Sequence, residues 1–247
     1  MGAAHPSMRP ALHGLRLGFA ALDAAALALE QVLGLTPIPV TPPAARGRPT
    51  RRHYALSGLR LEARSAPAAP GGYGPDDGRP ASADALQWRQ SDLARRRRHL
   101  ATLGLAAMEG VEFGCGDCLR LEAVDTGACA VELREPQDVA PPPALPGPRL
   151  AAIDLRVRAP ESVAVHWARL LGVPLGRDAD GAPRLEVSPM PVRFVAASAF
   201  EGAGVDALVL AGTDALAIAQ RAAAHGLRVA DDASWTAGGL RMRAAPR

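Results

Sequence analysis

Few side chains in this chain lie in a spacing that predicts chemistry. Cys115 and Cys118 form a C-x-x-C sequence, which occurs in redox motifs and metal sites. The pair stands in a glycine-rich approach to an expected strand, not at a strand-to-helix turn, and no second pair accompanies it, so we interpret it as incidental. All 28 basic residues are arginine. Without lysine, Schiff-base chemistry and a lysine general base are excluded.

The composition limits the class of protein. The chain has 247 residues, enough for one large or two small domains, and a net charge of +3. The absence of Lys and Asn, with abundant Ala, Gly and Pro, indicates genome composition more than a nucleic-acid-binding surface. The run Arg95 to Arg98 has no interleaved aromatic residues and is interpreted as a solvated helix face. With three cysteines and no apolar run of membrane-spanning length, we expect a cytoplasmic protein with no nucleic-acid or membrane partner.

The elements that would position functional residues follow one repeated pattern. Residues 150–172 read as a strand in which Ile153, Leu155 and Val157 alternate with polar residues, followed by a helix that begins at Pro160 and ends before Gly172. Four expected helices end on a glycine, at positions 34, 104, 172 and 226, and short strands follow each of them. The sequence therefore predicts an α+β fold of four βαβββ modules, the second with an unrecognisable entry strand and the last shortened.

Proline-rich sequence divides the modules into two pairs. Residues 1–9 are expected to be a disordered leader, and residues 137–148, which contain PPPALPGP, are expected to be a linker. A first domain would then cover residues 10–136 and a second, shorter domain residues 149–247.

Three segments, 12–35, 122–136 and 150–172, resemble the vicinal oxygen chelate superfamily. This superfamily includes glyoxalase I, methylmalonyl-CoA epimerase, extradiol dioxygenases and bleomycin-resistance proteins. The resemblance implies that the modules pair into two cupped mixed sheets with helices on the outer faces. It also implies that a cup binds a small molecule, often on a divalent metal ion.

The resemblance assigns metal ligands to the first and last strands of a module. In the first half these positions fall on Gly14, Glu62 and Glu132. His13 is one residue from the histidine position, and a one-residue offset on a strand turns a side chain to the opposite face. The candidate ligands of a divalent metal are therefore Glu62 and Glu132, completed by His53, by water or by the substrate. The alternative is that Glu62 and Glu132 are solvated or arginine-paired strand residues.

The second half offers no metal ligands at the equivalent positions, which fall on Ala152, Val195, Ala207 and Arg243. It is expected to support the first half or to form the interface of a homodimer. Two carboxylates are also too few for the histidine-rich iron site of an extradiol dioxygenase.

Strand alternation predicts an arginine-rich surface around the candidate carboxylates. Side chains two residues apart on a strand share a face, so the following arginines should lie beside Gly14, Glu62 and Glu132: Arg16, Arg60, Arg64 and Arg134. Guanidinium groups bind carboxylates and phosphates in a bidentate manner, which favours an anionic ligand. The alternative is that these arginines neutralise Glu62 and Glu132.

Two functional hypotheses follow. In the first, the protein is a glyoxalase-like lyase or isomerase in which Glu62 or Glu132 is a metal ligand or a general base. In the second, it is a metal-free protein of the bleomycin-resistance type that binds a small, anionic molecule without catalysis.

Overall fold

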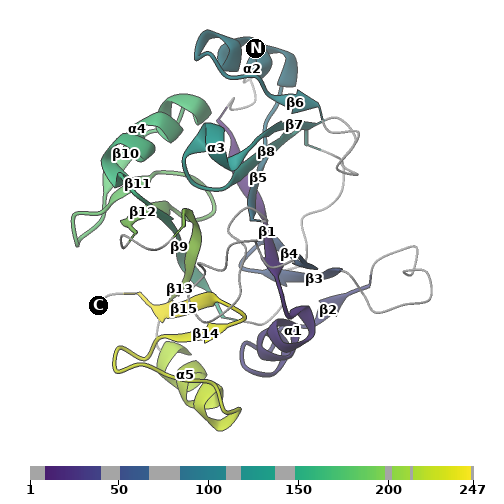
Figure 1. The fold of residues 1–247 in the computed structure, drawn as a ribbon, viewed down its shortest axis with the longest axis vertical. Helices are drawn as coiled ribbons and strands as arrows, with labels where there is room; N and C mark the ends of the chain where they lie inside the picture. The colour runs from purple at the N-terminus through teal and green to yellow at the C-terminus, as the bar shows by residue number, and fades with distance from the viewer. Residues whose placement is uncertain are drawn as a thin grey trace, which may run out of the picture.

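The computed structural model describes residues 9–39, 51–66, 84–109, 118–136, 148–197, 202–211 and 214–245. These residues form two mixed β-sheets side by side, with helices around them (Figure 1). The predicted α+β architecture is confirmed. Most of the expected leader and of the expected linker lies outside the described residues, so the domain boundaries stay a prediction.

The first sheet has eight described strands in the order β2-β3-β4-β1-β5-β8-β7-β6. Their bounds are β1 Ala11–Phe19, β2 Pro37–Ile38, β3 Arg51–Leu56, β4 Leu59–Ser65, β5 Ala85–Arg89, β6 Met108–Glu109, β7 Cys118–Leu121 and β8 Ala130–Arg134. The helices of this half are α1 Leu22–Gln31, α2 Leu93–Thr102 and the single turn α3 Ala123–Thr126. Each entry strand, β1 or β5, runs parallel to the last strand of its own module, β4 or β8.

The second sheet has seven described strands in the order β10-β11-β12-β9-β13-β15-β14. Their bounds are β9 Leu150–Val157, β10 Leu175–Arg177, β11 Pro183–Leu185, β12 Val192–Ala196, β13 Gly204–Leu210, β14 Trp235–Ala237 and β15 Leu240–Ala244. The helices here are α4 Pro160–Leu171 and α5 Asp214–Ala224. Within the described residues the fourth module has one strand fewer than the third, as the shortened repeat predicts.

The entry strand that the sequence did not reveal is β5. Its residues, Ala85 to Arg89, form a central strand between β1 and β8. Only Leu86 and Trp88 mark its apolar alternation, which is too short a pattern to separate a strand from a helix. The following helix is capped by Asp92, whose side chain accepts a hydrogen bond from the backbone N–H of Arg95 (2.8 Å).

A β-bulge interrupts the alternation of β1. Leu12 and Leu15 are both in the apolar core, and the pairing with β5 shifts register between Leu12 and Gly14. His13 and Gly14 therefore both lie away from the core, because a bulge places an extra residue in one strand. The expectation that a one-residue offset turns His13 to the opposite face is wrong for this reason.

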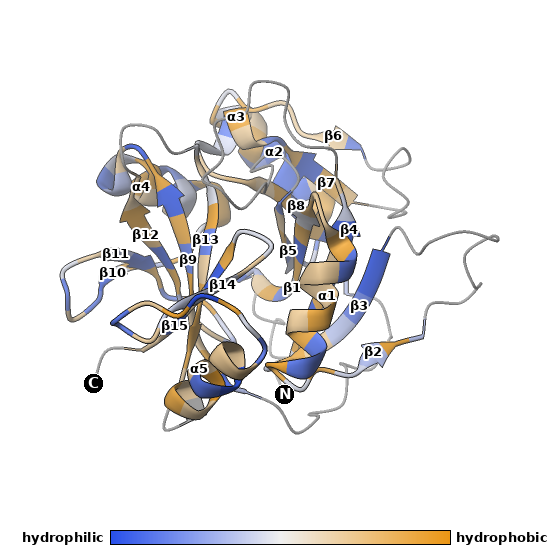
Figure 2. Ribbon diagram, turned by 60° about the horizontal axis from the view of Figure 1, so that its bottom comes forward, coloured by the Kyte–Doolittle hydropathy of each residue, from blue (hydrophilic) through white to orange (hydrophobic). Residues whose placement is uncertain are grey.

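The helices and the apolar faces of both sheets share one core. Buried residues from β1 through β15 form a single hydrophobic cluster, and α1 and α5 are coloured mostly apolar in Figure 2. Several hydrogen bonds join the two halves, and two of them illustrate the contact. Trp167 of α4 donates its indole N–H to the carbonyl of Thr126 (2.8 Å), and Arg221 of α5 donates to the carbonyl of Val32 after α1 (3.0 Å). No described helix has the length and apolarity needed to cross a membrane.

Candidate functional site

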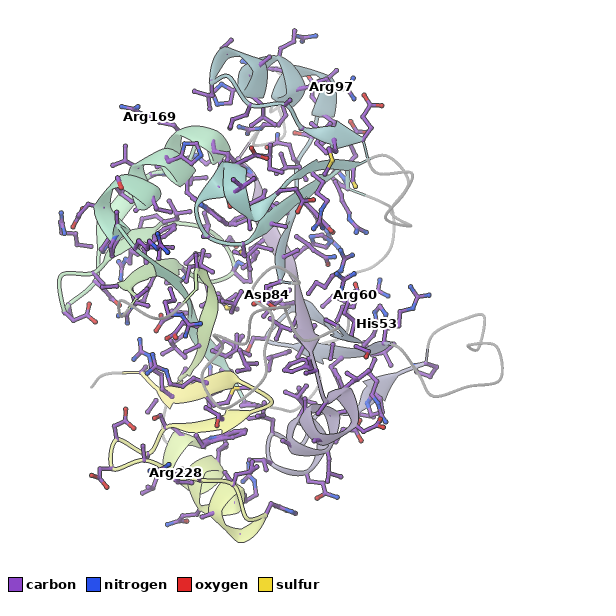
Figure 3. The ribbon with its side chains drawn as sticks, in the orientation of Figure 1. His53, Arg60, Asp84, Arg97, Arg169 and Arg228 are labelled. Atoms are coloured by element: carbon purple, nitrogen blue, oxygen red, sulfur yellow. The ribbon has the colours of Figure 1, made fainter. Side chains whose placement is uncertain are left out.

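The polar side chains of the first sheet gather on the face that lies opposite its apolar core. We call this surface the polar face, and it includes His13, Arg16, Arg51, His53, Arg60, Glu62, Arg64, Gln87, Arg89, Arg120, Glu132 and Arg134. Strand register explains the grouping, because Arg16 pairs with Glu62, His53 with Glu62, and Gln87 with Glu132. Figure 3 shows His53 and Arg60 next to each other on this side of the sheet. All of the site residues predicted from the sequence lie on this face.

Glu132 is the centre of an ion-pair network on the polar face. Its side chain is 0% exposed. One carboxylate oxygen, Oε1, accepts from Nη1 of Arg16 and from Nη1 of Arg120 (2.6 Å), and Oε2 accepts from Nη2 of Arg134 (2.9 Å) and Nε2 of Gln87 (3.1 Å). With four donors, the carboxylate has no lone pair left for a metal ion or a proton.

The charge state of Glu132 follows from these contacts. Burial acts to raise its pKa, but the positive charges of Arg16 and Arg134 outweigh burial, so the pKa lies below its usual range. The carboxylate therefore stays ionised at neutral pH. A carboxylate held in this way is a poor general base.

Arg16 occupies the position between the two predicted metal-binding carboxylates. Its Nε donates to Oε2 of Glu62 (3.2 Å), while its Nη1 donates to Glu132. The side chains of Arg16 and Glu62 are 6% and 14% exposed, so this is a largely desolvated bridge. The guanidinium supplies the positive charge that a metal ion would otherwise bring to these carboxylates.

Gly14 stands at the position where the resemblance expects a histidine ligand. A Cβ atom at Gly14 would overlap Oε1 of Gln87 and would lie 3.1 Å from the backbone oxygen of Arg60. The Gln87 side chain therefore fills the space that a ligand side chain would need. Gln87 could not be predicted as a site residue because its strand, β5, was not recognised in the sequence. The alternation of Leu86 and Trp88 with Gln87 was the pattern that could have indicated a strand with Gln87 on its polar face.

His53, the third candidate ligand, is buried and already bonded. Its Nδ1 accepts from Nε of Arg60 (3.0 Å), and its Nε2 is buried without a hydrogen-bond partner. Burial and the charge of Arg60 lower the pKa of His53. Among the described residues, no group of three or more His, Cys, Asp and Glu side chains could hold a metal ion. The donor set does not fit the metal ion that the resemblance implies.

Four arginines of the polar face have no acidic partner within the described part of the chain, and one of them is Arg51, which lies opposite Arg64 in the pairing of β3 with β4. The other three are Arg64, Arg89 and Arg60, which donates from Nε to Nδ1 of His53. The Nε of Arg64 is buried without a hydrogen-bond partner, and burial together with the nearby charge of Arg16 lowers the pKa of Arg64. Arg89 lies on β5, the strand that the sequence did not reveal, and is opposite Arg134 in the pairing of β5 with β8.

The second sheet has a polar face of its own, and it is also ion-paired. The pairing of β13 with β9 places Asp154, not Ala152, opposite Ala207. Asp154 is 1% exposed and its Oδ2 contacts Nη2 of Arg243 at 2.7 Å. Asp206 pairs with Arg156 (3.2 Å) and with Arg241. These contacts leave the described acidic groups of this face bonded to arginine.

Two pockets and the cysteine pair are further candidate sites, and they are lined or formed by residues outside the polar face. A pocket of about 290 Å³ is lined by Arg9, Gln90, Ser91, Asp92, Arg95, Arg96, His99 and Gly172, and a second, of about 500 Å³, by Glu161, Ser162, Val165, His166 and Arg169. Cys118, at the start of β7, is disulfide-bonded, whereas Cys115 lies outside the described residues.

The architecture defines a known class of fold, the one found in solved structures of extradiol dioxygenases and of a glyoxalase. The chain is similar to the 2,3-dioxygenase LapB from Pseudomonas sp. KL28, with a TM-score of 0.64 and 16% identity over 97% of this chain and 92% of that chain. It is also similar to a Mn(II)-bound glyoxalase from Novosphingobium aromaticivorans, with a TM-score of 0.61 and 14% identity over 96% and 81% of the two chains. Neither a family model nor a curated protein matches the sequence. At these identities the similarity establishes the fold alone.

Proposed function

We propose that this protein binds a small anionic molecule on the polar face of the first sheet, and that it does so without a metal ion. The observation that supports this proposal is that only some arginines of the polar face are paired with a carboxylate. Arg16, Arg120 and Arg134 are bonded to Glu132, while Arg60, Arg64 and Arg89 have no acidic partner among the described residues.

The unpaired arginines favour an anion for electrostatic reasons. A buried N–H donor without a partner loses the hydrogen bonds that it would make to water, and the Nε of Arg64 is in this position. Arg89 and Arg134 face each other across β5 and β8, which places like charges close together. A carboxylate or phosphate bound between such groups offsets both costs and forms charge-assisted hydrogen bonds.

The metal-dependent lyase or isomerase hypothesis has less support. Its two catalytic residues and metal ligands would be Glu62 and Glu132, but Arg16 bridges them and Glu132 accepts four hydrogen bonds. Of the two carboxylates, Glu62 alone keeps an oxygen, Oε1, without a described partner. The similarity to a Mn(II)-bound glyoxalase concerns the fold, and the residues on this face fit an anion better than a cation.

The proposal is tested by calorimetric titration of chelator-treated protein with propionate and with inorganic phosphate. Arg64→Gln and Arg89→Gln are each expected to weaken binding of the preferred anion about tenfold, because a charged hydrogen bond is worth about 1.5 kcal/mol or more. Arg228→Gln is the matched control, since Arg228 is exposed and lies at the far side of the second half (Figure 3).

Metal analysis of protein grown with added Mn²⁺ and Fe²⁺ separates the two hypotheses. We expect less than one bound metal ion per ten chains. One metal ion per chain that is lost in Glu132→Ala, or anion binding that is equal in the wild type and both arginine variants, would contradict the proposal.

A further inference from the structure

His13 is a titratable group of the polar face that lies outside the ion-pair network of Glu132. The bulge in β1 turns His13 away from the core together with Gly14. Its neighbours on the adjoining strands are set by register, because Gly14 pairs with Arg60 on β4 and Ala11 pairs with Arg89 on β5. Arg134 on β8 follows beyond Arg89. His13 therefore lies among three guanidinium groups.

One ring nitrogen of His13 is fixed by the backbone. Its Nδ1 lies 3.0 Å from the carbonyl oxygen of Gln87. A carbonyl oxygen only accepts, so Nδ1 carries the proton and donates it. In the neutral ring Nε2 is then left as a hydrogen-bond acceptor, and it has no partner among the described residues.

The surroundings keep this ring neutral. Burial, with smaller contributions from the charges of Arg89, Arg134 and Arg60, lowers the pKa of His13 to about 4, against the opposing effect of the Gln87 carbonyl. At neutral pH the three guanidinium groups are therefore accompanied by Nε2 of His13, an uncharged hydrogen-bond acceptor. An arginine has no acceptor atom, so this nitrogen adds a different kind of recognition.

We infer that Nε2 of His13 accepts a hydrogen bond from a hydroxyl group of the bound anion, and that the ligand is therefore a small hydroxycarboxylic acid with its hydroxyl group next to its carboxylate. This inference rests on the proposed function, because it takes the carboxylate to be bound by the arginines. A ketone at the same position has no proton to donate. An ammonium group has protons, but its charge is repelled by Arg60, Arg89 and Arg134.

Four acids of nearly equal size test this assignment: lactate, propionate, pyruvate and alanine. Titration of the wild-type protein should show lactate binding about fivefold more tightly than propionate, as one additional hydrogen bond permits, with pyruvate and alanine no tighter than propionate. His13→Phe keeps a planar ring without the acceptor and should bring the ratio of lactate to propionate affinity to about one. His225→Phe, at an exposed position after α5, should keep the ratio of the wild type.

A spectroscopic measurement on the wild-type protein removes any dependence on how the variant folds. In protein labelled with ¹⁵N in its imidazole rings, lactate should shift the Nε2 resonance of His13 and propionate should shift it far less. Equal affinities for lactate and propionate, a lactate preference that persists in His13→Phe, or equal shifts with both acids would overturn the inference. If propionate binds and Arg89→Gln weakens it, the proposed function stands whatever the hydroxyl result; if no acid or phosphate binds, both fail.

Discussion

Glu132 brings more charge together than any other described side chain of the polar face. It is fully buried, forms ion pairs with three arginines and accepts a fourth hydrogen bond from Gln87. A buried charge that loses its partner is costly, because the remaining ion is neither solvated nor paired. The network is therefore expected to contribute to the stability of the fold as well as to the shape of the ligand site.

Replacing Glu132 by glutamine keeps the volume and removes the charge. The three guanidinium groups then lose the carboxylate that they share. Because they stay largely buried, we expect the free energy of unfolding, measured by urea denaturation, to fall by about 3–5 kcal/mol. Glu161→Gln removes a carboxylate from an exposed pair with Arg177 and should leave the free energy of unfolding unchanged within error. Equal effects of the two substitutions would contradict the role given to burial here.

Individual arginines of the polar face also differ in their role, which is either to bind an anionic ligand or to neutralise Glu62 and Glu132. The alternative that they neutralise Glu62 and Glu132 describes Arg16 and Arg134. It does not describe Arg60 or Arg64, which have no ion pair with any described acid. Both interpretations therefore apply, each to a different pair of arginines.

At the scale of elements, the arginine run in α2 has a use that its sequence did not indicate. Arg96 donates to the carbonyl oxygens of Leu170 (2.9 Å) and Leu171 (3.2 Å) at the end of α4. The last carbonyl groups of a helix have no partner within the helix, so Arg96 caps α4 from the other half of the molecule. The interpretation of a solvated face suits Arg97, which is 54% exposed.

This difference gives a comparison within one helix. Arg96→Ala leaves two carbonyl groups without their charged donor, and we expect it to lower the free energy of unfolding by about 1.5–3 kcal/mol. Arg97→Ala removes only an exposed pair with Glu109 and should cost about 0–1 kcal/mol. Thermal or urea unfolding of both variants measures the difference, and a larger loss in Arg97→Ala would refute the capping role.

At the scale of the whole molecule, the two sheets are joined by a continuous apolar cluster. Trp88 of the first half and Trp167 and Trp235 of the second half are each no more than 2% exposed and belong to this cluster. Elements that share a core usually unfold together. The two halves are therefore expected to behave as one cooperative unit, in spite of the proline-rich sequence between them.

Tryptophan fluorescence tests this expectation. A variant that keeps only Trp88 and a variant that keeps only Trp167 report on different halves, with the other tryptophans replaced by phenylalanine. Within each variant, fluorescence and far-ultraviolet circular dichroism should give the same urea midpoint. A fluorescence transition that precedes the circular dichroism transition in either variant would show that the halves unfold separately.

The sequence by itself determined the repeated modules and the α+β class, because apolar periods of 2 and 3.6 and the glycines that end helices are local properties of the chain. It also determined that Arg16, Arg60, Arg64, Glu62, Glu132 and Arg134 share a face. Only the tertiary structure decided which of these charges meet: Arg16 contacts Glu62 and Glu132, which are 46 and 116 residues away, and Gln87 fills the space beside Gly14. Strand order, register and the bulge at His13 result from burial summed over distant segments, and no local pattern in the chain specifies them.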